Sequence, residues 1–141
     1  MKPGDEPDWS RVYSPSLEDF ELLAAAAFAR LPVTFRARCE GVLIRVEDFA
    51  EDDALADLGI DSPFDLMGLY RGASIAAGPG VVRSGPDMVL LFRRAILDYW
   101  AEFEETLGHL VTHVLIHEIG HHLGLSDTDM EAIEKDVTET S

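Results

Sequence analysis

The chain has 141 residues, of which 47% are hydrophobic, so it can build one domain with a buried core but not two of full size. Its 27 acidic and 11 basic residues give a formal net charge of −16, which argues against nucleic acid or an anionic membrane surface as a partner. The longest apolar run, residues 22–29, is too short to span a bilayer. Cys39 is the only cysteine, which excludes an internal disulfide and favours a soluble protein in the reducing cytoplasm.

The distribution of prolines and charges predicts three parts of unequal size. Residues 1–15 contain prolines and charged side chains without periodicity, which is typical of a flexible lead-in. We expect a single domain over residues 16–136. An acidic tail is expected over residues 137–141.

Two helices are predicted at the start of the domain. Ser16 is a candidate N-cap, and the alanine-rich stretch after it predicts a helix that runs to about Arg30. Pro32 ends this helix because proline does not fit into a helix interior. A second, short helix is expected over residues 33–39.

Three apolar segments of strand length follow these helices: residues 42–46, 66–70 and 88–92. The acidic stretch 47–65 contains no basic residue and predicts a solvated loop with a short helix. The glycine- and proline-rich segment 72–87 predicts a wide hairpin or a flap. We interpret residues 88–92 as a buried strand; the alternative is an edge strand that pairs with an extended substrate.

The segment HEIGHHLGLSD, residues 117–127, lies in a region that is predicted to be helical from Ile96 onward. Residues four apart on a helix share one face, so His117 and His121 can direct ring nitrogens to one metal ion. Glu118 lies beside them, where its carboxylate can reach a metal-bound water.

An apolar seam leads into this segment. Its leucines and valines recur at spacings of three and four, and the polar residues of the motif take the next positions: Leu107, Leu110, Val111, Val114, His117, Glu118 and His121. Imidazoles and a carboxylate in a buried seam are costly without partners, and a metal ion satisfies them.

A hydrolytic zinc site needs a third protein ligand and an open fourth position. Gly124 can adopt a left-handed conformation, end the helix and bring Asp127 back toward the metal. Asp127 is therefore the preferred third ligand. Asp129, Glu131 and Glu134 are the alternatives, as acidic residues of a later helix.

Further histidines flank the motif. Each step of four residues advances about 40° around a helix, so His109 lies about 120° from His121 and cannot share its metal. We interpret His113 as a hydrogen-bonded histidine rather than a ligand. His122 faces away from the other two and is interpreted as a capping or surface residue.

The segment HEIGHHLGLSD resembles the HExxHxxGxxD signature of small bacterial zincin-like metallopeptidases, the minimal zincins. A weaker resemblance extends to residues 69–72 and 87–94, which precede the motif in the same order as in that family. The resemblance implies an α+β fold, a compact zincin-like domain with a small twisted sheet of about three to four strands against a buried active-site helix and an N-terminal helix. It also implies a zinc ion with three ligands and a general base: His117, His121, Asp127 and Glu118.

These residues predict a zinc-dependent metallopeptidase that acts on peptides or unfolded proteins. Zinc lowers the pKa of its water to about 7, Glu118 accepts the proton, and the hydroxide attacks the peptide carbonyl. Tyr70, Tyr99 and His122 are candidates for stabilising the oxyanion, and none is preferred. The alternative function is a non-catalytic, zinc-stabilised domain with an acidic partner interface, but a structural site has no need of Glu118.

Overall fold

The computed structural model of the chain describes residues 6–72 and 87–140. Within these residues it has six α-helices and one three-stranded mixed sheet, which confirms the predicted α+β class. The strand order is β1-β3-β2, in which β1 (Leu43–Glu47) is parallel to β3 (Met88–Phe92) and β2 (Gly68–Arg71) is antiparallel to it.

The central strand, β3, is buried from Val89 to Phe92. Its two neighbours pair with it in register, Leu43 opposite Met88 and Gly68 opposite Leu91. The interpretation of this segment as a buried strand is therefore confirmed, and the edge-strand alternative is wrong. The predicted flap lies almost wholly outside the described residues, which exclude 73–86.

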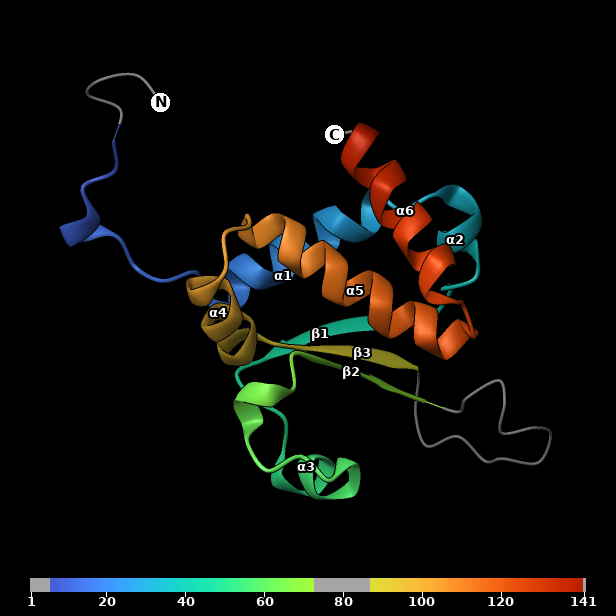
Figure 1. Ribbon diagram of the computed structural model, residues 1–141, viewed down its shortest axis with the longest axis horizontal. Coiled ribbons are helices and arrows are strands. Elements are labelled where there is room, and N and C mark those ends of the chain that lie inside the picture. Colours follow the sequence, from blue (N-terminus) through green and yellow to red (C-terminus); the bar gives the residue numbers. More distant parts are fainter. Residues whose placement is uncertain (1–5, 73–86, 141) are drawn as a thin grey trace.

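Two helices, α1 (Leu17–Ala29) and α5 (Leu107–Leu123), cover one face of the sheet (Figure 1). The cap of α1 is reciprocal: the Ser16 hydroxyl accepts from the Asp19 N–H, and the Asp19 carboxylate accepts from the Ser16 N–H. This cap confirms the predicted start of the first helix at Ser16. Between the two helices and the sheet lies the main core, whose largest fully buried side chains include Phe20, Leu91, Leu115 and Ile116.

At one end of α5 lie α2 (Val33–Ala37) and α6 (Asp127–Thr140) (Figure 1). The short helix expected over residues 33–39 is present as α2. α6 packs against α5 and contributes the fully buried Met130 and Val137 to the main core. α6 ends at Thr140 and therefore continues beyond residue 137, where the acidic tail was expected to begin.

The opposite face of the sheet carries the acidic stretch, which includes α3 (Asp52–Leu58) and the 3-10 helix η2 (Pro63–Asp65) (Figure 1). Leu55 of α3 joins Leu90 and Phe92 of β3 in a second, smaller hydrophobic cluster. The expected short helix is therefore present, and it is attached to the sheet through an apolar contact.

After β3 the chain enters α4 (Arg93–Glu102), so the predicted helical region begins earlier than Ile96 and is broken between α4 and α5. Arg93 binds two separate segments. Its Nε donates over 2.6 Å to the carbonyl of Pro15, which follows the 3-10 helix η1 (Trp9–Arg11), and its Nη1 donates over 3.0 Å to the carboxylate of Asp48, which follows β1. Among the described residues, no helix has the length and apolar character needed to cross a membrane.

Candidate metal centre

The helix α5 carries the HEIGHH residues, and both of its ends are defined by capping residues. Thr106 accepts a hydrogen bond from the His109 N–H at 3.1 Å, which stabilises the first turn. Gly124 has φ +78° and its N–H bonds to the last turn of the helix, so the predicted left-handed stop is confirmed.

His117 and His121 lie one turn apart, with ring centroids 5.9 Å from each other. The His117 side chain is 22% exposed, whereas His121 is exposed to solvent. Burial lowers the pKa of His117, and the neighbouring His113 lowers it further, which favours the neutral imidazole. Neutral imidazole is the form that binds a metal ion.

Glu118 lies on the side of α5 that faces β2. The N–H of Tyr70 donates a hydrogen bond to its carboxylate, and the nearby His121 also favours the ionised form. Burial is the largest effect and raises the pKa of Glu118. A Cβ on Gly68 would lie 3.0 Å from Glu118 Cγ, so the missing side chain of Gly68 lets Glu118 approach the strand.

A stacked pair of rings joins α5 to β2 beside Glu118. The rings of Tyr70 and His122 lie 3.7 Å apart and within 9° of parallel. Asp87 faces both, with Oδ2 3.4 Å from the Tyr70 hydroxyl and 3.9 Å from His122 Nε2. The His122 side chain is only 9% exposed, so its interpretation as a capping or surface residue is wrong. The reason is the close approach of β2, which the helical geometry of α5 alone does not reveal.

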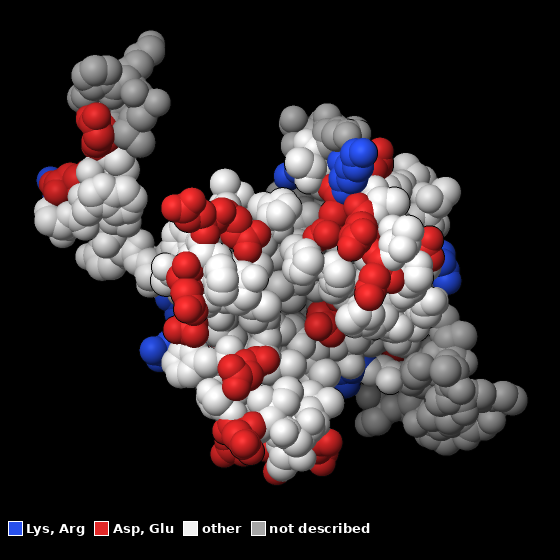
Figure 2. Space-filling view, viewed as in Figure 1, with Lys and Arg blue, Asp and Glu red and all other residues white. Residues whose placement is uncertain are grey.

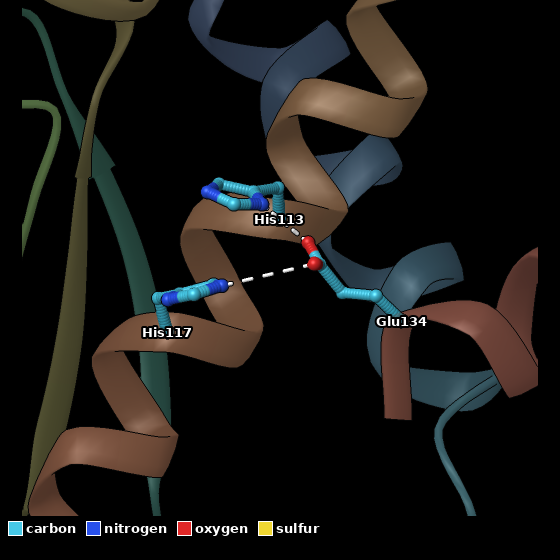
Figure 3. Close-up of side chains that lie close together, drawn as sticks. All are labelled: His113, His117 and Glu134. Carbon is cyan, nitrogen blue, oxygen red and sulfur yellow. Dashed lines mark hydrogen bonds and ion pairs between the residues drawn. The ribbon is translucent and has the colours of Figure 1, made fainter. Parts of the chain in front are cut away.

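On the other side of α5, Glu134 of α6 reaches two histidines (Figure 3). One carboxylate oxygen is hydrogen-bonded to His113 Nδ1, and the other lies 3.7 Å from His117 Nε2. The predicted hydrogen-bonded state of His113 is thus confirmed. One ligand atom from each of the three side chains lies within 4.8 Å of the others, close enough for a shared metal ion.

The other candidate third ligands lie at the start of α6. Asp127 is its first residue and is exposed, and within the described part of the chain it joins no group of three potential ligands. Asp129 caps the helix through its hydrogen bond from the Ser126 N–H at 3.3 Å. Glu131 is exposed. Of the four acids considered, Glu134 is the one that the described contacts bring to His117.

A model of the family described as zincin-like metallopeptidase matches residues 39–137, well over half of the chain. The chain belongs to this family. None of the curated proteins compared with the chain matches it. The match covers the whole sheet and α5, and it begins after α1.

Membership of the zincin-like family confirms the resemblance carried by HEIGHHLGLSD and indicates a metallopeptidase, with zinc as the metal typical of zincins. The residues present fit such an ion. His117 Nε2 is buried and has no hydrogen-bond partner in the described part of the chain, and imidazole nitrogens with carboxylate oxygens are ligands that zinc prefers.

The proximity of Glu134 to His117 did not follow from the sequence, although a signal for it exists. Met130, Glu134 and Val137 recur at spacings of four and three, so they share one face of α6. The two apolar members are buried against the core, and this places Glu134 between them against α5.

Proposed function

We propose that the chain is a zinc-dependent metallopeptidase in which His117, His121 and Asp127 hold the metal and Glu118 is the general base. The placement of Glu118 carries the proposal. Its carboxylate is half-buried, held by the Tyr70 N–H and next to His121, and a purely structural metal site has no use for a carboxylate there.

A bound zinc ion supplies Lewis acidity, which in such sites lowers the pKa of a coordinated water to about 7. Glu118 accepts a proton from the attacking water as the new C–O bond forms on the peptide carbonyl. The same carboxyl group then donates this proton to the amide nitrogen as the C–N bond breaks. The Tyr70 N–H keeps the carboxylate oriented during both transfers.

The surface favours peptides of neutral or positive charge. Acidic side chains are spread over the face seen in Figure 2, whereas basic side chains are few there. This agrees with the net charge of −16 and attracts cationic substrates at low ionic strength. Within the described residues β2 is an outer strand and adjoins Glu118, so we expect an extended peptide to lie along it.

The substitution Glu118→Gln tests the catalytic proposal. We expect the variant to keep about one zinc ion per chain and to lose at least about 100-fold in hydrolysis of a labelled unfolded protein, because the base is removed. Glu131→Gln is the matched control, with the same charge change at an exposed position of α6. Full activity of Glu118→Gln would overturn the proposal.

The same assay separates the second candidate function. A zinc-stabilised binding domain would contain zinc and would hydrolyse none of a library of peptides, either as wild type or as Glu118→Gln. The acidic surface is the observation that favours this candidate, since it suits a basic partner as well as a basic substrate.

The third ligand is tested separately by comparing Asp127→Ala with Glu134→Gln. If Asp127 completes the site, its loss lowers the zinc affinity of the hydrolytic site by 10-fold or more and lowers hydrolysis in proportion. A loss of affinity and hydrolysis in Glu134→Gln alone would instead assign the third position to Glu134.

A further inference from the structure

His113, His117 and Glu134 form a group of potential ligands that is displaced along α5 by one turn from the pair His117 and His121 (Figure 3). We propose that this group is a metal site of its own, which binds a zinc-like divalent cation and shares His117 with the hydrolytic site. Because both sites need His117, a cation in one excludes a cation from the other. We call the new site the offset site.

The geometry of the offset site is close to that of a bound ion. Zinc–nitrogen and zinc–oxygen bonds of about 2.0–2.2 Å place tetrahedral ligand atoms about 3.3–3.6 Å apart. His117 Nε2 lies 3.7 Å from one oxygen of Glu134, and His113 Nδ1 is hydrogen-bonded to the other. The ligand atoms of all three lie within 4.8 Å of one another, so small side-chain rotations suffice.

A simple hydrogen-bonded pair does not account for the whole group. The bond between His113 and Glu134 satisfies His113. It leaves His117 Nε2 buried and without a hydrogen-bond partner among the described residues. The rings of the two histidines lie 4.1 Å apart, and each has one ring nitrogen facing the Glu134 carboxylate (Figure 3), so one ion satisfies all three side chains.

A cation in the offset site is expected to be inactive, and this part of the inference rests on the proposed function. Glu118 is held toward β2, where the Tyr70 N–H donates to its carboxylate and His121 lies nearby. The offset site lies on the α6 side, one turn from His121, and uses a carboxylate of α6 instead. The offset site therefore binds metal away from Glu118, the general base. Because one ion is divided between the two sites, the fraction of chains with the ion in the hydrolytic site is the active fraction.

Metal content and affinity of the full chain test the offset site directly. Zinc and cobalt binding are measured by competition with a chelator, and visible cobalt absorption reports the ligand set. We expect His121→Ala to retain about one ion per chain in the offset site. Adding His113→Ala or Glu134→Gln to that variant lowers its affinity by at least 10-fold, and His117→Ala alone abolishes binding at both sites.

Two matched controls accompany these variants. His109→Ala removes an exposed histidine from the same helix, and Glu131→Gln removes an exposed carboxylate from α6; neither is expected to change the affinity of His121→Ala. Circular dichroism of each metal-free variant verifies folding, and His113→Gln replaces His113→Ala if the latter unfolds.

The outcomes separate the two proposals. The offset site is overturned if His121→Ala loses all metal, or if the metal affinity of His121→Ala stays the same when His113→Ala or Glu134→Gln is added. Either result leaves the proposed hydrolytic site intact. Loss of all metal from His113→Ala, with retention by His121→Ala, supports the offset site and overturns the proposed hydrolytic one.

Discussion

The two sides of α5 hold their polar residues in different ways. Toward β2, Glu118 is fixed by a backbone N–H of the sheet, which cannot rotate away. Toward α6, His113 and His117 meet the side chain of Glu134, whose position depends on how one helix packs on another. The sheet therefore positions Glu118, whereas helix packing positions Glu134 near the histidines. Substitutions on the two sides of α5 should affect these two residues separately.

Both sides are closely packed at a glycine. On the β2 side, a Cβ on Gly68 would lie 2.8 Å from Val114 Cγ1. On the α6 side, a Cβ on Gly120 would collide with the side chain of Met130, lying 2.7 Å from its Cγ. These two contacts set the distances from α5 to its neighbours. Substitutions at them test whether the two sides of α5 differ as described.

The largest effect is expected from Met130→Ala on the α6 side. Met130 is fully buried against Gly120, and removing its side chain leaves a cavity that costs about 2–5 kcal/mol of unfolding free energy. Urea denaturation measures this loss, with the exposed Glu131→Ala as control, which should stay within about 0.5 kcal/mol of wild type. A loss below about 1 kcal/mol would mean that α6 packs loosely on α5.

Metal binding should stabilise the α6 side of α5 more than the β2 side. A ligand present at 100 times its Kd stabilises the folded state by about 2.7 kcal/mol, and excess chelator should reverse the effect. Because the proposed offset site joins α5 to α6, amide hydrogen exchange should slow more in α6 than in β2 when zinc is added. Equal protection of β2 would remove the difference between the two sides.

Gly68→Ala tests the β2 side. The added methyl group presses on Val114 and Glu118, which should cost about 1–3 kcal/mol and displace the carboxylate from the Tyr70 N–H. We expect hydrolysis to fall by 10-fold or more while zinc content stays near wild type. Gly108→Ala is the control, since a Cβ there meets nothing within 4 Å. A proportional loss of zinc would show that the two sides are coupled.

The sequence predicts the local parts of the fold and the site well. The cap at Ser16, the strand over residues 88–92 and the stop at Gly124 are each specified by a few neighbouring residues. The common face of His117 and His121 also follows from helical periodicity alone. These features need no knowledge of which elements meet.

Contacts between elements were less predictable. His122 is covered because β2 approaches α5, and that approach depends on the order of the strands. Glu134 reaches His117 because Met130 and Val137 are buried against the core, which sets the rotation of α6 about its own axis. Periodicity indicates which side chains share a face, but the tertiary packing decides what that face meets.

Thr106→Ala is expected to have the smallest effect and acts on both sides alike. Loss of the N-cap hydrogen bond to His109 should cost about 1 kcal/mol, which lowers the stability of α5 as a whole. The cap lies at the far end of α5 from Glu118 and His121, so zinc affinity and hydrolysis in the folded protein should stay within about twofold of wild type. A change in zinc affinity without a change in hydrolysis, or the reverse, would mean that α5 transmits strain along its length. The independence of the two sides of α5 would then depend on the cap as well as on β2 and α6.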